Sequence, residues 1–315
     1  MLTIDKVYAA KNVLKKVIRP TAVIPAFDLS STNHVYLKTE NLLLSAAYKF
    51  RGATTKIKTL IETSGTEVRI ITASSGNHGM ACALAASRLG IPATVVVPVP
   101  TPQIKKDYIR SLGANLLEIG ETYDDSFLAA CELAETEKMF YVHPVSDRYT
   151  VAGQGTITLE LLEQIPDLDQ VIVPIGGGGL ITGISFTIKQ LKPSVKLVGV
   201  MPEGSAVYYA SRQAGNLLTL EHCASMADAC VRKTGEPYLY PYIEQYVDEI
   251  VTVTEESIRK AVKMACLYGK LTLEGAGAMP LAALLENKCQ AIGKTVLICS
   301  GGNIDQKVLN ACLNI

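Results

Sequence analysis

The stretch Val171-Ile-Val-Pro-Ile-Gly-Gly-Gly-Gly-Leu180 joins a run of apolar residues to four consecutive glycines and then to a helical pattern. A strand, a glycine turn and a helix in this order indicate one unit of a parallel α/β sheet. Each glycine costs about 0.5 to 1 kcal/mol relative to alanine, so an ordinary turn does not account for four of them. A cup of backbone amides that binds a phosphate does account for them. The run matches neither the G-x-G-x-x-G dinucleotide motif nor the G-x-x-x-x-G-K-[ST] P-loop motif.

The same alternation of short apolar runs and amphipathic stretches continues along the chain on both sides of these glycines. Strands are expected at 34–38, 68–72, 93–97, 115–118, 171–173, 196–200, 250–253 and 295–298. Helices are expected near 49–62, 77–89, 121–137, 154–164, 179–191, 255–268, 276–286 and 303–313. Strands that are apolar on both faces predict parallel sheets covered by helices. Ligands of such sheets bind beyond the carboxyl ends of the strands, so the turns after strands are the candidate sites.

Composition excludes several classes of protein. The chain has 315 residues, 48% of them hydrophobic, which predicts a large core and about two domains. Thirty basic and thirty acidic residues balance, so neither nucleic acid nor an anionic membrane is an expected partner. The eight cysteines include no C-x-x-C pair, which argues against a zinc site or a dithiol motif. Residues 1–16 lack the apolar core of a signal peptide, and we expect a cytoplasmic protein with reduced cysteines.

Two further turns and one lysine carry the remaining signals. Ser74-Ser75-Gly76-Asn77-His78-Gly79 precedes an Ala-rich helix, and is either a site for a carboxylate or phosphate or a plain capped helix start. Ser300-Gly301-Gly302-Asn303 follows the last expected strand, where Ser300 either faces the crevice or caps a helix. Lys49 lies among small and aromatic residues; it is either a solvated surface lysine or a Schiff-base nucleophile with a lowered pKa. Residues 215–246 are irregular, and form either a cover over an active site or a surface connection.

In this order and spacing, these segments resemble the fold type II pyridoxal-phosphate enzymes, whose fold is that of the tryptophan synthase β chain. The resemblance is to the group of threonine ammonia-lyases (threonine/serine dehydratases) and serine racemases, and it covers nearly the whole chain. Its other segments are Arg19-Pro-Thr21, Tyr36-Leu-Lys-Thr-Glu-Asn-Leu42, Lys49-Phe-Arg-Gly-Ala53, Ala152-Gly-Gln-Gly-Thr156 and Glu274-Gly-Ala-Gly-Ala278.

The resemblance implies pyridoxal 5'-phosphate as cofactor and gives each candidate residue a role. Lys49 would hold the cofactor covalently and act as the catalytic base, with Phe50 beside it. The phosphate would lie against Gly176, Gly177, Gly178, Gly179 and the amide of Leu180. Asn77 would bind the phenolic oxygen and Ser300 would face the pyridine nitrogen, where a neutral serine favours β-elimination. The substrate carboxylate would be held by Ser74, Ser75, Gly76, Asn77 and His78.

The resemblance also implies an architecture. A large cofactor-binding domain would comprise residues 1–64 and 147–315, and a small mobile α/β domain residues 65–146, with the cofactor in the cleft. Closure of the small domain on the substrate would exclude water. A homodimer or homotetramer is expected. No stretch follows the Ser300 turn that is long enough for a regulatory domain, which favours the catabolic type of threonine ammonia-lyase.

The leading function is a lyase that converts L-threonine or L-serine to ammonia and a 2-oxo acid. One alternative is a serine racemase, in which Ser75 is a second catalytic acid/base. A second is a dehydratase of another β-hydroxy amino acid, such as 3-hydroxyaspartate. A third is a non-catalytic protein that keeps the fold and binds a phosphate ligand.

Several positions depart from the family's pattern. Ala46-Ala47-Tyr48 precedes the lysine where a hydroxyl residue and Phe are common, and Met80 replaces a usual glutamine. The Ala-Asp-Gly segment reads Ala227-Asp228-Ala229, which adds a methyl group beside the substrate pocket. Met201 and Val207 stand where metal-dependent racemases have carboxylates, so no metal site is expected.

Overall fold

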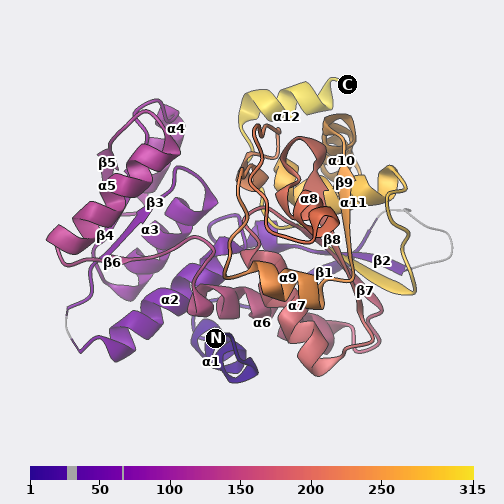
Figure 1. Cartoon of the computed structure of the whole chain (residues 1–315), viewed down its shortest axis with the longest axis horizontal. Coiled ribbons are helices and arrows are strands. Elements are labelled where there is room, and N and C mark those ends of the chain that lie inside the picture. The colour runs from indigo at the N-terminus through magenta and orange to yellow at the C-terminus, as the bar shows by residue number, and fades with distance from the viewer. Residues whose placement is uncertain (27–33, 66) are drawn as a thin grey trace.

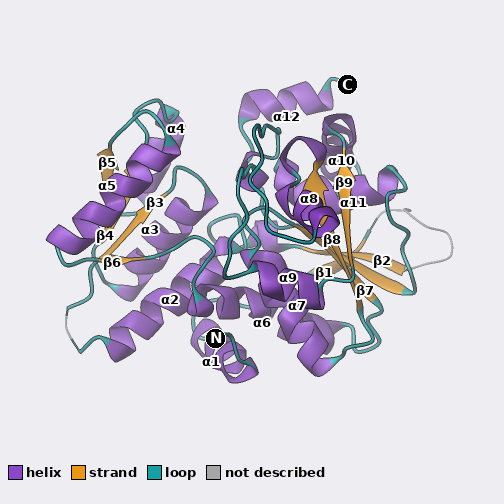
Figure 2. Cartoon of the chain, viewed as in Figure 1, coloured by secondary structure: helices purple, strands orange, loops and turns teal. Residues whose placement is uncertain are grey.

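The strands form two separate sheets in the computed structural model, which describes residues 1–26, 34–65 and 67–315. Figure 2 shows the two groups of strands on opposite sides of the molecule. The six-stranded sheet has the order β1-β2-β10-β7-β8-β9, with β1 (Val23–Pro25), β2 (His34–Lys38), β7 (Gln170–Pro174), β8 (Lys196–Pro202), β9 (Glu249–Val253) and β10 (Lys294–Ile298). The four-stranded sheet has the order β5-β4-β3-β6, with β3 (Ile70–Ala73), β4 (Ala93–Val97), β5 (Asn115–Glu118) and β6 (Phe140–Tyr141).

Helices cover both sheets (Figure 1). The N-terminal part of the chain and the four-stranded sheet carry α1 (Ile4–Leu14), α2 (Lys49–Thr63), α3 (Asn77–Leu89), α4 (Gln103–Ser111) and α5 (Tyr123–Thr136). The remaining α-helices are α6 (Arg148–Gln164), α7 (Gly179–Leu191), α8 (Val207–Ala214), α9 (Tyr240–Tyr246), α10 (Glu255–Leu267), α11 (Gly275–Leu285) and α12 (Gln306–Leu313). Short 3-10 turns lie at η1 (Glu40–Leu42), η2 (Glu203–Ser205) and η3 (Asp228–Cys230).

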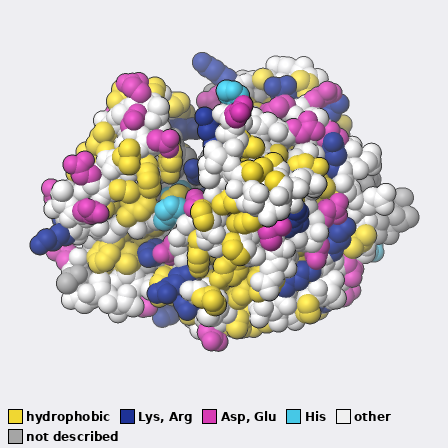
Figure 3. All heavy atoms as spheres, in the orientation of Figure 1, with side chains coloured by type: hydrophobic (Ala, Val, Ile, Leu, Met, Phe, Trp, Pro, Cys, Tyr) yellow, Lys and Arg dark blue, Asp and Glu magenta, His cyan; other side chains and the backbone are white. Residues whose placement is uncertain are grey.

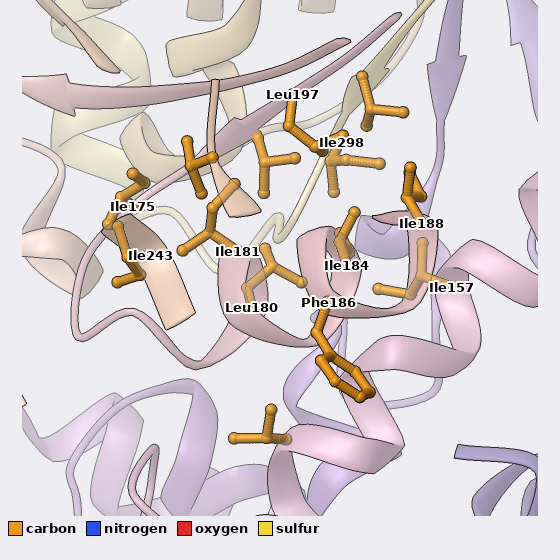
Figure 4. Packing of buried hydrophobic residues seen from close by; sticks show 14 of the residues in the cluster. Ile157, Ile175, Leu180, Ile181, Ile184, Phe186, Ile188, Leu197, Ile243 and Ile298 are labelled. Carbon is orange, nitrogen blue, oxygen red and sulfur yellow. The ribbon is translucent and has the colours of Figure 1, made fainter. Parts of the chain in front are cut away.

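The core beneath the six-stranded sheet explains why the glycine turn opens a helix. Ile181 and Ile184 of α7 are fully buried and point toward Leu197 of β8 and Ile298 of β10 (Figure 4). Since α7 is held by this apolar face, its first turn is fixed at the carboxyl end of β7. The packing therefore presents the backbone N–H groups at the start of α7 at the edge of the sheet.

The predicted architecture of two parallel-sheet α/β units is confirmed, with one exception at an edge. All strand pairs are parallel except β1 with β2, which are antiparallel. Strands β1 and β6 were not predicted, because strands of three and two residues show no periodicity. The helices α1, α4, α8 and α9 lie outside the stretches that were named as examples of helical pattern. The predicted domain boundaries, 1–64 with 147–315 and 65–146, stay a prediction, because the assignment of strands to two sheets does not show which segments move together.

No helix of the described residues is both long and apolar enough to cross a membrane. The described residues also contain no group of three or more His, Cys, Asp or Glu side chains placed to hold a metal ion.

Candidate active site

Two cavities adjoin between the sheets, at the carboxyl ends of the strands, and Figure 3 shows the surface hollowed between the two parts of the molecule. The larger cavity has a volume of about 360 Å³ and the smaller one about 30 Å³. Lys49, Asn77, Ala229, Arg232 and Glu274 line both cavities. The structure thus brings Lys49, the turn at residues 74–79 and the irregular segment 215–246 together at these cavities.

Lys49 is the first residue of α2, and its Nζ donates a hydrogen bond of 2.8 Å to the carbonyl of Pro144. The segment before it is fixed by the Ser300 turn, because the N–H of Tyr48 donates to the carbonyl of Ser300 at 3.0 Å. Burial lowers the pKa of Lys49 to about 7, and the positive charge of Arg232 acts in the same direction. A large fraction of the amine is therefore neutral at pH 7, as a nucleophile or base must be.

The N-terminus of α3 faces the larger cavity. Ser74, Ser75, Gly76, Asn77 and His78 all line this cavity, and no side chain caps the first turn of the helix. The first N–H groups of a helix have no partner within it, and its dipole favours an anion there. Burial lowers the pKa of His78 to about 3, so its ring is neutral and adds no charge to the site.

The glycine turn lines the smaller cavity with Gly176, Gly177, Gly178 and Leu180. A Cβ at Gly178 would lie 2.8 Å from the Tyr208 hydroxyl, and this glycine has a φ of +91°. Packing from outside thus excludes a side chain here, and the turn presents its backbone to the cavity. A Cβ at Gly179 would meet Val145 at 3.4 Å, an ordinary contact, and this residue does not line either cavity.

A hydrogen-bonded group of three side chains joins the turn at residues 74–79 to the turn at residues 300–303. The Asn77 amide N–H donates to Glu274 Oε1 at 2.7 Å, and its carbonyl accepts from Asn303 Nδ2 at 2.7 Å. Because this amide carries two N–H groups, one stays free for a ligand. Burial raises the pKa of Glu274 to about 8, and the negative charge of Asp228 adds to this effect. Glu274 is therefore mostly a neutral acid at pH 7.

The structure separates two predicted residues from the others. Phe50 is fully buried in the core of the four-stranded sheet and does not line either cavity. Gly179 is the first residue of α7 and does not line either cavity. Ser300 does line the smaller cavity. Met80 lines the larger cavity, and Ala229 lines both. The sequence assigned no individual role to Glu274, Arg232 or Tyr208, because burial and tertiary contacts determine what these side chains can do.

Known proteins resemble this chain over nearly its whole length. The family described as "Pyridoxal-phosphate dependent enzyme" matches residues 14–301. The chain belongs to this family of pyridoxal-phosphate enzymes. An L-threonine ammonia-lyase of Thermotoga maritima is 39% identical over 317 residues, covering 100% of this chain and 79% of that protein. Among solved structures, maize serine racemase has a TM-score of 0.92 and 31% identity, covering 99% of this chain and 97% of that one. The processed threonine deaminase isoform 2 of Solanum lycopersicum has a TM-score of 0.91 and 32% identity, covering 98% and 88%.

The residues of this pyridoxal-phosphate enzyme fit the cofactor. The smaller cavity offers an N-terminal helix turn for a phosphate, and the buried amine of Lys49 lies on the same lining. The Ser300 hydroxyl, which is buried, makes no hydrogen bond to the residues that the structure describes and is available to a ring nitrogen. Together these groups supply a donor for the phosphate, a nucleophile for the aldehyde and a neutral partner for the ring.

Tyr208 braces the glycine turn of this enzyme, and its replacement by phenylalanine is expected to weaken cofactor binding about 10-fold. Its hydroxyl donates to the carbonyl of Gly177 at 3.1 Å and accepts from the N–H of Glu236 at 2.8 Å. Loss of two hydrogen bonds costs about 1 to 2 kcal/mol, and here it destabilises the conformation of the glycine turn that would bind the phosphate. The dissociation constant of pyridoxal phosphate, measured by visible absorption, tests this. The matched Tyr209→Phe variant alters a more exposed neighbour on α8 and should bind normally; equal constants for both variants would show that Tyr208 does not support the turn.

Proposed function

We propose that this enzyme is an ammonia-lyase that converts L-threonine or L-serine to a 2-oxo acid and ammonia, by loss of water followed by hydrolysis. One observation carries the proposal: Lys49, an amine whose pKa is lowered, and Glu274, an acid whose pKa is raised, line the same cavity. Lys49 is available as a base and Glu274 as an acid at the same pH. The named activity of the Thermotoga maritima relative supports this assignment.

The chain's own residues divide the work of the elimination. The N-terminus of α3 holds the substrate carboxylate through the backbone N–H groups of Ser75, Asn77 and His78, which orients the substrate. When bound, pyridoxal phosphate supplies an electron sink for the carbon that loses its proton. The neutral Nζ of Lys49 removes the Cα proton, and the Cβ–O bond breaks. The hydroxyl leaves as water, and the remaining enamine tautomerises and hydrolyses to ammonia and the 2-oxo acid.

Glu274 is proposed to protonate the leaving hydroxyl, so Glu274→Gln should lower kcat by about 10²-fold or more. The amide of glutamine still accepts the hydrogen bond from Asn77, but it cannot give up a proton. The rate of 2-oxo acid formation at saturating L-threonine measures the loss. Glu203→Gln, at an exposed acid, serves as the control. A Glu274→Gln enzyme with unchanged kcat would assign the proton to another acid, such as the cofactor phosphate.

Titration of the purified holoenzyme with L-threonine, followed by visible absorption and 2-oxo acid assay, tests the proposed function. A cofactor band that shifts while 2-oxobutanoate accumulates is the expected result. A band that does not change with L-threonine or L-serine would contradict the elimination. Failure to bind pyridoxal phosphate at all would contradict the role of Lys49.

Serine racemisation is the second candidate, because Ser75 lines the larger cavity and maize serine racemase is a close structural neighbour. A racemase needs a second acid/base at Cα, and the Ser75 hydroxyl is a candidate for that role. Incubation with L-serine and a chiral assay separates the two activities. D-serine formed faster than pyruvate would favour the racemase.

We also propose a cytoplasmic homodimer or homotetramer, in which residues 65–146 move as a unit when substrate binds. The eight cysteines are all free, which supports a reducing compartment. Symmetric homo-oligomers are the common state of soluble enzymes. Light scattering of the purified protein measures the mass in solution.

A further inference from the structure

Arg232 lies where the two cavities meet. It follows η3 and its half-buried side chain lines both cavities. Its backbone is fixed, because its N–H donates to the buried Ser205 hydroxyl at 2.9 Å and its carbonyl accepts from that hydroxyl at 3.2 Å. Its guanidinium carbon lies 5.3 Å from the ring centroid of Tyr123, which belongs to α5 on the other side of the cleft. The charge is thus held inside the site rather than in open solvent.

No counter-ion of this charge lies within residues 1–26, 34–65 and 67–315. Among the residues that the structure describes, no carboxylate makes an ion pair with Arg232 and no side chain hydrogen-bonds its guanidinium. The two acids on the cavity lining do not compensate it. Asp228 lies 3.5 Å from Lys105 Nζ, and Glu274, with a pKa of about 8, is mostly neutral at pH 7. Lys and Arg side chains also border the hollow in Figure 3. The cavity therefore carries a fixed positive charge that is left for a ligand.

The anions already assigned to the site do not need this charge. The substrate's α-carboxylate has the N-terminus of α3, and the cofactor phosphate has the glycine turn and the N-terminus of α7. The side chain of threonine or serine offers a hydroxyl, with or without a methyl group, and no charge. Desolvating a guanidinium against such a side chain is unfavourable, whereas a carboxylate matches its planar fork.

We propose that Arg232 binds a second carboxylate, so that the preferred substrates are 3-hydroxy amino acids with an acidic side chain, of the 3-hydroxyaspartate class. The inference rests on the proposed lyase reaction and keeps its chemistry. The Cα–H and Cβ–O bonds break, water leaves, and hydrolysis of the enamine gives ammonia and a 2-oxo diacid. Arg232 is then the residue that determines specificity, and Ala229 lies beside it on the same lining.

The test compares four holoenzymes: wild type, Arg232→Gln, Arg232→Lys and Lys233→Gln. Lys233 is the exposed next residue, so its variant loses the same charge outside the cavity. In wild type, kcat/KM for 3-hydroxyaspartate should exceed that for L-threonine. Arg232→Gln should lower kcat/KM for 3-hydroxyaspartate by about 10²-fold, mainly through KM, since a bidentate charge-assisted contact is lost. The same variant should lower kcat/KM for L-threonine by a much smaller factor, which reflects only the loss of the charge that helps to lower the pKa of Lys49, because threonine has no second carboxylate. For 3-hydroxyaspartate, kcat/KM of Arg232→Lys should lie between the values of wild type and Arg232→Gln, and kcat/KM of Lys233→Gln should match wild type.

A binding measurement gives a readout apart from turnover. Succinate, a dicarboxylate with the carbon chain of aspartate, should bind to wild type more tightly than succinamate, in which one carboxylate is an amide. Calorimetric titration of the holoenzyme measures both, and Arg232→Gln should abolish the difference.

Three results would overturn the proposal. Equal losses on both substrates with a raised dissociation constant for the cofactor would assign Arg232 to the phosphate. Equal losses with normal cofactor binding would assign it to the α-carboxylate. Normal L-threonine turnover with no preference for succinate or 3-hydroxyaspartate would refute the inference and leave the lyase intact. Absence of turnover on either substrate would refute the lyase, while the succinate comparison would still decide what Arg232 binds.

Discussion

Replacement of Lys49 by alanine is expected to lower kcat by about 10³-fold or more, a loss within the range for removal of a general base. The same change removes the amine that would carry the cofactor. Borohydride fixes a lysine-bound cofactor permanently, so reduction followed by mass spectrometry should label wild type at Lys49 and leave the variant unlabelled. In wild type, the rate at which cofactor-free enzyme takes up pyridoxal phosphate should rise through about pH 7, because burial lowers the pKa of Lys49 to about 7 and only the neutral amine reacts.

Lys58→Ala is the matched control for this result. Lys58 lies on the same helix, its side chain is 34% exposed, and its Nζ lies 3.4 Å from Glu62. Its loss should leave kcat and the label unchanged. A Lys49→Ala enzyme that remains active and labelled at another lysine would overturn the assignment of the nucleophile and of the cleft as the site.

Local sequence was enough to predict the parts of the site that depend on backbone. The four glycines after an apolar run predicted the turn from β7 to α7, and the small residues after β3 predicted the exposed start of α3. Both depend on chain geometry that neighbouring residues decide. The boundaries of β2, β4 and β5 were predicted as well, since buried strands leave an uninterrupted apolar or alternating pattern.

The parts of the site that depend on tertiary burial could not be predicted. Glu274 was visible only as part of a motif, and its protonation follows from its burial and from the negative charge of Asp228. Arg232 is one basic residue in an irregular segment, and its proposed role depends on its place at the cavity, where none of the described residues acts as its counter-ion. Phe50, next to Lys49 in sequence, was expected beside the cofactor; it is buried in the core of the four-stranded sheet and lines neither cavity, and its position beside the cofactor stays a prediction.

Arg51, two residues after Lys49, forms a buried ionic cluster that ties α2 to the six-stranded sheet. Its Nε donates to Glu40 Oε2 at 2.7 Å and its Nη1 donates to Glu160 Oε1 at 2.6 Å. Lys38 of β2 donates to Glu160 Oε2 at 2.6 Å. The side chains of Arg51, Glu40 and Lys38 are fully buried. These ions have left water, so each depends on the others for compensation.

Arg51→Met should therefore lower the free energy of unfolding by about 3 to 5 kcal/mol, because two buried carboxylates are left facing one lysine. Such a loss is a large share of the stability of a typical domain, about 5 to 15 kcal/mol. Urea denaturation followed by far-UV circular dichroism measures it. Arg110→Met, at a side chain that is 44% exposed and 2.7 Å from Glu118, should cost less than about 1 kcal/mol. Arg51→Lys keeps the charge but loses the planar fork, and should fall between the two. If Arg51→Met and Arg110→Met unfold at the same urea concentration, the cluster does not stabilise the fold, and the position of Lys49 depends on its backbone contacts with the Ser300 turn.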